Sequence, residues 1–133
     1  MRYLALALLA PVLLLGACSE TKPIPPDFAK LGQLTYAKPV EGVPATVVFV
    51  RDLGFLDVGQ TAYVTIDGET AAKLQTAEKV TIDLTAGDHV FGVGKMLLPV
   101  PATATLDARL APGQTYVYRL VSDATGMRIE SAK

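Results

Sequence analysis

The strongest indication of the fold is the stretch Lys79-Val80-Thr81-Ile82-Asp83-Leu84-Thr85-Ala86-Gly87-Asp88-His89-Val90. From Lys79 to Leu84 polar and apolar residues alternate strictly, so every second side chain shares one apolar face, as in a half-buried β-strand. Ala86-Gly87-Asp88 is typical of a turn, and residues 89–93 return as a second strand. Because the polar residues lie on one face only, the pattern favours antiparallel pairing.

Further segments with the sequence character of strands lie on both sides of this stretch. Residues 46–51 are rich in β-branched residues, and the stretch is apolar on both faces, which is typical of a central strand. Further strands are expected over 61–67, 103–110, 116–121 and 127–131, separated by turn residues. Six to eight short strands at this spacing predict an all-β fold, a small antiparallel β-sandwich over residues 45–133, or a small barrel.

Two segments carry a partial family resemblance. Val64-Thr65-Ile66-Asp67-Gly68-Glu69, followed by the alternating residues 80–90 with Gly87-Asp88-His89, resembles the PEGA-type and related β domains of bacterial envelope proteins. The unit spans about residues 61–94. The chain also resembles an uncharacterised family of small bacterial lipoproteins. The resemblance implies a non-catalytic surface module with a binding or spacing role.

The N-terminus has the layout of a secretory signal peptide. Arg2 supplies the positive charge, Leu4–Leu15 the apolar region, and small residues lead into the only cysteine, Cys18. A membrane-spanning helix needs about 20 apolar residues, and this segment is shorter and contains Pro11. Leu15-Gly16-Ala17-Cys18 resembles the bacterial lipobox. This implies removal of residues 1–17 as a lipoprotein signal peptide and diacylglycerol on the Cys18 sulfur.

The residues after Cys18 bear on location and spacing. Ser19 resembles outer-membrane sorting in enteric-type bacteria, where aspartate at this position implies inner-membrane retention. We therefore expect a lipid-anchored protein of the bacterial envelope, on the outer membrane facing the periplasm. Residues 18–44 are predicted to be the lipidated cysteine, a Pro-rich tether and a lead-in. Phe28, Leu31 and Leu34 recur at helical spacing, but Gly32 limits any helix to a turn or two.

Composition and spacing exclude several kinds of chemistry. The formal charge is −1 without a basic block, so nucleic acid is not expected as a partner. With Cys18 lipidated, the single histidine, His89, cannot supply a zinc site, and we interpret it as a hydrogen-bonding turn residue. The carboxylates, Asp52 among them, are dispersed and interpreted as solvated. We predict no catalytic residue, no cofactor and no metal site.

Two apolar loops are candidate partner-binding sites. Residues 52–59 and 95–101 lie between expected strands yet carry large apolar side chains. One interpretation is that the loops cover an end of the sandwich; a second is that they form an exposed patch for a protein partner; a third is that they rest on lipid headgroups near the anchor. The candidate partner-binding residues are Phe55, Leu56, Met96, Leu97 and Leu98.

These observations predict a non-catalytic binding or assembly module with an envelope protein as partner. The alternative is a lipoprotein that binds a ligand, either a glycan such as peptidoglycan or a small apolar molecule. That alternative predicts a concave pocket lined by Tyr116 and Tyr118, which alternate on one face of a late strand. Strand tyrosines more commonly pack against neighbouring strands.

Overall fold

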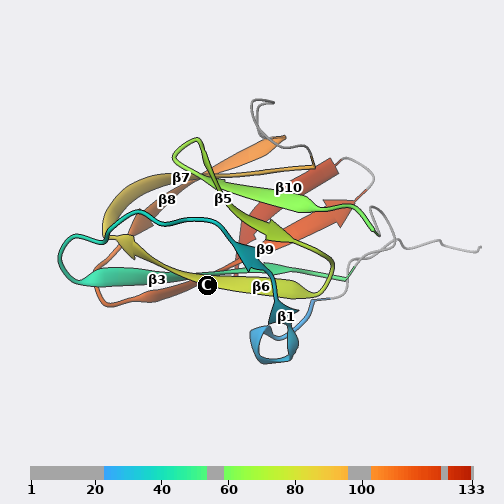
Figure 1. Cartoon of the computed structure of the whole chain (residues 1–133), viewed down its shortest axis with the longest axis horizontal. Coiled ribbons are helices and arrows are strands. Elements are labelled where there is room, and N and C mark those ends of the chain that lie inside the picture. Colours follow the sequence, from blue (N-terminus) through green and yellow to red (C-terminus); the bar gives the residue numbers. More distant parts are fainter. Residues whose placement is uncertain (1–22, 54–58, 96–102, 124–125, 133) are drawn as a thin grey trace, which may run out of the picture.

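A computed structural model describes residues 23–53, 59–95, 103–123 and 126–132 (Figure 1). These residues form an all-β fold, as the alternation predicts, with one short 3-10 turn near the start. The elements are η1 (Pro26–Phe28), β1 (Lys30–Leu31), β2 (Gln33–Leu34), β3 (Pro44–Arg51), β4 (Ala62–Ile66), β5 (Glu69–Leu74), β6 (Glu78–Thr85), β7 (Gly87–Gly94), β8 (Ala104–Leu110), β9 (Thr115–Asp123) and β10 (Gly126–Ser131).

The strands form two five-stranded sheets that pack as a sandwich, with the orders β1-β6-β3-β9-β10 and β2-β5-β4-β7-β8. Strand β3 is central in the first sheet, as its apolar sequence predicts. Its pairing with β9 is parallel, however, with Val47 opposite Tyr116. The expectation of antiparallel pairing is wrong here because the chain crosses to the second sheet and returns between β3 and β9.

The β4–β5 hairpin explains one strand that the sequence did not predict. Asp67 and Gly68 both have positive φ, 52° and 85°, as a two-residue type I′ hairpin turn requires. Strand β5 follows at once, although its sequence does not alternate and contains two adjacent alanines. Both Ala71 and Ala72 are fully buried, and the β4–β5 register shifts after Val64. A strand buried on both faces gives no period of two.

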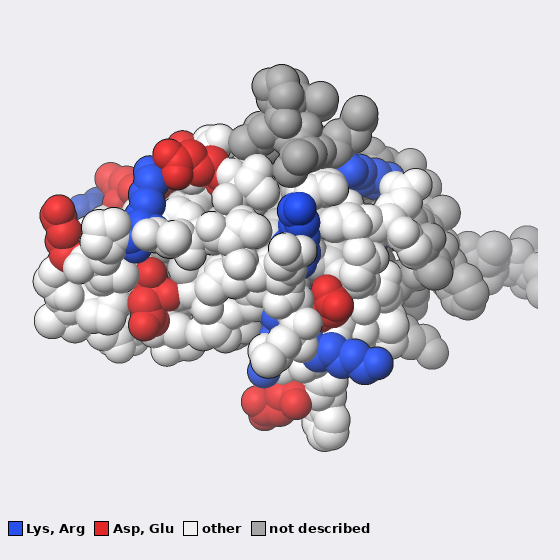
Figure 2. Space-filling view, in the orientation of Figure 1, with Lys and Arg blue, Asp and Glu red and all other residues white. Residues whose placement is uncertain are grey.

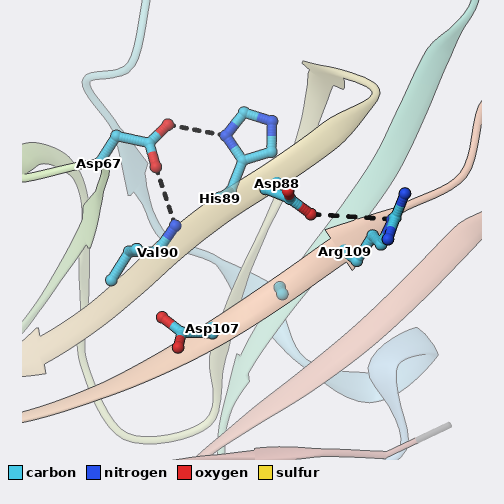
Figure 3. Close-up of a pocket in the computed structure, with 7 residues that line it drawn as sticks. Asp67, Asp88, His89, Val90, Asp107 and Arg109 are labelled. Carbon is cyan, nitrogen blue, oxygen red and sulfur yellow. Dashed lines mark hydrogen bonds and ion pairs between the residues drawn. The ribbon is translucent and has the colours of Figure 1, made fainter.

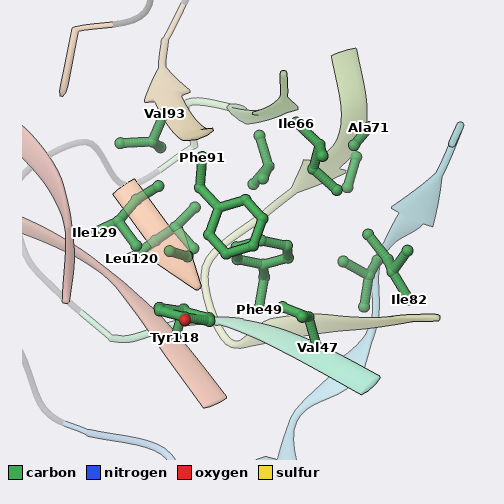
Figure 4. Packing of buried hydrophobic residues seen from close by; sticks show 14 of the residues in the cluster. Val47, Phe49, Ile66, Ala71, Ile82, Phe91, Val93, Tyr118, Leu120 and Ile129 are labelled. Carbon is green, nitrogen blue, oxygen red and sulfur yellow. The ribbon is translucent and has the colours of Figure 1, made fainter. Parts of the chain in front are cut away.

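Three aromatic rings fill the centre of the core (Figure 4). Phe49 of β3 and Tyr118 of β9 come from the first sheet, and Phe91 of β7 comes from the second. Phe91 packs edge-on against both other rings, with centroid distances of 5.0 Å. Edge-to-face packing of this kind adds to the gain from burial. Because the three rings come from both sheets, their packing holds the two sheets together.

Residues 30–34, here called the strap, close one side of the sandwich. Its first half pairs with β6 and its second half with β5, so it joins the edges of both sheets. Gly32 stands between the halves and donates its N–H to the Lys79 carbonyl (2.8 Å). A Cβ at Gly32 would lie 2.2 Å from Leu74 Cδ2, so only glycine fits there without displacing its neighbour.

The crossing from β8 to β9 is fixed by Tyr116. Its hydroxyl oxygen accepts a hydrogen bond from the Ala111 N–H (2.8 Å), five residues upstream. This arrangement corresponds to the tyrosine corner found where a β-sandwich strand begins after a crossing between sheets. It positions the start of β9 beside the start of β3.

Candidate functional site

All the residues predicted as sites from sequence lie outside the described part of the chain. They are the lipid-attachment residue Cys18 and the partner-binding candidates Phe55, Leu56, Met96, Leu97 and Leu98. The structure does describe the strands on either side of the two apolar loops, and those strands determine where the loops begin and end.

A partly buried ion pair, with the carboxylate fully enclosed, holds the N-terminal segment to the domain. Arg119 Nη1 donates to Asp52 Oδ1 (2.6 Å) and to the Ile24 carbonyl (3.0 Å), while the Ile24 N–H donates to the same Asp52 oxygen (3.3 Å). We call these three residues the clasp. The Asp52 side chain is only 3% exposed, so its interpretation as a solvated carboxylate is wrong.

The parallel pairing of β3 and β9 builds the clasp. Asp52 follows the last residue of β3, and its N–H donates to the Leu120 carbonyl of β9 (3.2 Å). Arg119 lies opposite Val50 in the same pairing. Sequence reasoning missed this site because the two charges are 67 residues apart and come together only through a strand pairing that the alternation did not predict.

Both apolar loops leave the sandwich at this same end, here called the clasp end. The first loop follows β3 and returns at β4, and the buried Arg51 guanidinium donates to the Gln60 and Leu74 carbonyls beside it. The second loop follows β7, where Gly94 lies opposite Tyr63 at the start of β4. The second loop therefore begins beside the strand at which the first loop ends.

A second charged cluster lies at the opposite end of the sandwich. His89 Nδ1 is 2.7 Å from Asp67 Oδ2, and His89 Nε2 is 2.6 Å from the Thr85 carbonyl oxygen. Asp67 Oδ1 also accepts the Val90 N–H (2.8 Å). We call His89, Asp67 and Thr85 the histidine latch, because they join the β4–β5 turn to the β6–β7 connection. This confirms the prediction that His89 is a hydrogen-bonding residue near a turn.

The latch favours a protonated imidazole. Both ring nitrogens face oxygens that only accept hydrogen bonds, so both need a proton. Burial by itself lowers the pKa of His89, but the hydrogen bonds to Thr85 and Asp67 outweigh it and raise that pKa above 6.5. Burial likewise raises the pKa of Asp67, and the bonds from Val90 and His89 reverse this and hold it below 3.8.

A shallow hollow of about 410 Å³ lies beside the latch (Figure 3). His89 lies at its edge together with Asp107 and with Asp88 and Arg109, which approach to 3.9 Å but are 84% and 90% exposed. Acidic and basic side chains are also interspersed on the face seen in Figure 2. In the described ranges, no three His, Cys, Asp or Glu residues are grouped to hold a metal ion.

The two tyrosines do not form a shared binding surface. Tyr118 is 5% exposed and belongs to the aromatic core, where burial raises its pKa. Tyr116 packs partly against the core and supplies the tyrosine corner. Neither lines the hollow beside His89 or a second hollow between the strap and β4. The interpretation that these tyrosines pack against neighbouring strands is confirmed.

Comparison with protein-family models and with curated proteins finds no match to this chain. Within the described residues, no helix has the length and apolar character needed to cross a membrane.

Proposed function

We propose that this chain is a lipid-anchored lipoprotein of the bacterial envelope whose β-sandwich is a non-catalytic binding or assembly module. The observation that carries the proposal is the apolar segment Leu4–Leu15 running into Leu15-Gly16-Ala17-Cys18. Diacylglycerol on Cys18 together with an amide-linked acyl chain gives more than one lipid anchor, which is enough for stable attachment to a membrane.

The described polar groups support a non-catalytic role. Arg51, Asp52 and Arg119 hold strands and the N-terminal segment in place, and His89 is hydrogen-bonded through both ring nitrogens. In the described part of the chain, every buried side-chain nitrogen or oxygen has a hydrogen-bond partner. Groups engaged in this way stabilise the fold.

Metabolic labelling tests the lipid anchor. The full chain is expressed in a bacterium with an alkyne fatty acid, and Cys18→Ala is compared with Ser19→Ala, which retains the thiol. We expect the parent chain and Ser19→Ala to be labelled and shortened, and Cys18→Ala to remain an unlabelled precursor. Normal processing and membrane localisation of Cys18→Ala would refute the proposal.

Crosslinking in intact cells, followed by purification and mass spectrometry, tests the binding role. We expect a small reproducible set of envelope proteins that is lost in Phe55→Ser/Leu97→Ser and retained in Val43→Ser, which removes an exposed apolar side chain elsewhere. Circular dichroism checks that the double variant still unfolds cooperatively. Recovery of peptidoglycan fragments instead of proteins would favour the ligand-binding alternative.

A further inference from the structure

The clasp determines how far the domain can lie from a membrane anchor. Both the N–H and the carbonyl of Ile24 are held by Asp52 and Arg119, so the chain is fixed to the domain at this residue. Ile24 stands six residues after Cys18. Six residues span at most about 20 Å even when fully extended. The part of the tether that precedes this fixed residue is therefore much shorter than residues 18–44, and the clasp end stays close to the attachment point.

Large apolar side chains are exposed next to the clasp. Phe28 is 82% exposed and Leu31 81%, and both lie within seven residues of Ile24. Leu53, which directly follows Asp52, is 41% exposed. We call these three residues the apolar rim. Transfer of such side chains out of water is favourable, and their position near the anchor identifies what can cover them.

The strap places the rim at the clasp end. The Lys30 N–H donates to the Ala77 carbonyl (2.9 Å), and the Ala77 N–H donates to the carbonyl of Arg51 (3.0 Å), which precedes Asp52. The opposite end of the sandwich carries the exposed charges of Asp88 and Arg109. Figure 1 shows η1 and β1 well away from β7 and β8. The rim and these charges are thus on different parts of the surface.

We propose that the clasp end is seated on the lipid bilayer, with Phe28, Leu31 and Leu53 among the lipid headgroups. This inference rests on the proposed lipidation of Cys18. The short span from Cys18 to Ile24 holds the rim within reach of the membrane, and burial of the rim favours the seated orientation over free rotation. Both apolar loops also begin at this end.

Spin labelling of the lipidated full chain in vesicles of phosphatidylethanolamine and phosphatidylglycerol tests the seating. Because Cys18 is lipidated, a cysteine introduced as Lys30→Cys or as Gln114→Cys is the single free thiol. Lys30 lies between the rim residues, and Gln114 is an exposed residue beside the start of β3. Strand β3 has eight residues, so the two labels are separated by about 25 Å.

We expect a water-soluble nickel chelate to reach the label at position 30 several-fold less than the label at position 114. Adding Phe28→Ser/Leu31→Ser should raise access at position 30 to the level at position 114. The matched change Val43→Ser, an apolar residue 63% exposed beside the start of β3, should leave it unchanged. These serine changes are at exposed positions, and circular dichroism confirms that each variant is folded.

The outcomes separate this inference from the proposed function. If the chain binds vesicles with a lipidated Cys18 but both labels are equally accessible, the proposed orientation on the bilayer is wrong. The proposed lipid anchor is then still supported. If mass spectrometry shows an unmodified Cys18 and the chain does not bind vesicles, both proposals are wrong.

Discussion

The two ends of the sandwich are each held by a charged pair, and the pairs differ in burial and in chemistry. At the clasp end, Asp52 and Arg119 are 3% and 21% exposed, and the cation is an arginine guanidinium. At the opposite end, Asp67 is 42% exposed and its partner is a histidine. A histidine can change its charge between pH 5 and pH 8.

These differences in burial and chemistry predict different contributions to stability. The clasp fixes the N-terminal segment at Ile24 through a pair that is largely shielded from water and therefore weakly screened. The histidine latch joins two connections that the flanking strands already bring together. Loss of the clasp should therefore cost far more stability than loss of the latch.

The largest expected effect is that of Arg119→Ala. The change leaves the Asp52 carboxylate buried without its cation and releases the Ile24 carbonyl. Breaking a buried ion pair from one side costs about 3–5 kcal/mol. Urea unfolding followed by circular dichroism should show a loss of about 3 kcal/mol in the free energy of unfolding, with faster amide exchange near Ile24.

Arg109→Ala provides the matched control. It removes an arginine from a pair that is 90% and 84% exposed and separated by 3.9 Å. Exposed pairs of this kind contribute about 0–1 kcal/mol, so we expect a change below about 0.5 kcal/mol. Equal losses for the two variants would contradict the view that burial distinguishes the clasp.

The strap that begins at the clasp end should respond to Gly32→Ala. The added methyl would meet the buried Leu74 side chain and the Lys73 carbonyl, at 2.2 Å and 3.1 Å. Overpacking of this kind costs about 1–3 kcal/mol. Hydrogen exchange should show lost protection of the N–H groups of residues 30 and 32. The neighbouring exposed change Gln33→Ala should leave that protection intact, and an equal loss there would contradict the steric explanation.

Local patterns in the sequence predicted some of the strands and missed others. Alternation is a local signal, so β6, β7 and β8 were predicted close to their observed bounds. Strand β5 was missed because Ala71 and Ala72 are both buried and the alternation is lost there. The strap was missed because backbone hydrogen bonds hold it while most of its side chains point to solvent.

Long-range pairs limited the prediction of the site. Asp52 and Arg119 meet only because β3 and β9 are parallel neighbours, and one strand's pattern does not say which partner it takes. His89 was interpreted correctly because its neighbours Gly87 and Asp88 are turn residues. Its partner Asp67, 22 residues away, was not predicted. The apolar rim was visible as Phe28 and Leu31, but the helical spacing gave no hint that they are exposed.

The latch should make stability depend on pH. The pKa of His89 is raised in the folded state, so its contribution is complete below 6.5 and is lost as the pH rises through the raised value. The pKa of Asp67 is lowered, so its contribution is present above 3.8 and is lost as the pH falls through the lowered value. Thermal unfolding should show the largest contribution between these limits, about 0.5–1 kcal/mol given the exposure of Asp67.

His89→Gln sharpens this comparison of the two ends. The amide keeps a polar group at the position but does not titrate, so the loss of stability as the pH rises above 6.5 should disappear. Arg119→Ala, although much less stable, should keep the pH dependence of the parent chain in that range. A parent-like slope in His89→Gln would assign the pH dependence to another group.

Apart from the Arg109→Ala control, the smallest expected effect is that of Tyr116→Phe, next to the latch end. Only the hydroxyl oxygen is removed, and the ring that packs partly against the core remains. The Ala111 N–H loses its acceptor, but Ala111 is exposed and water can replace the hydroxyl oxygen as acceptor.

A lost hydrogen bond of this kind costs about 0.5–1 kcal/mol. The same urea experiment should give a loss near the lower value, because the start of β9 is also held by the Thr46 N–H, which donates to the Gln114 carbonyl (2.9 Å). A loss as large as that of Arg119→Ala would contradict the view that the strand pairings hold the start of β9 without the tyrosine corner.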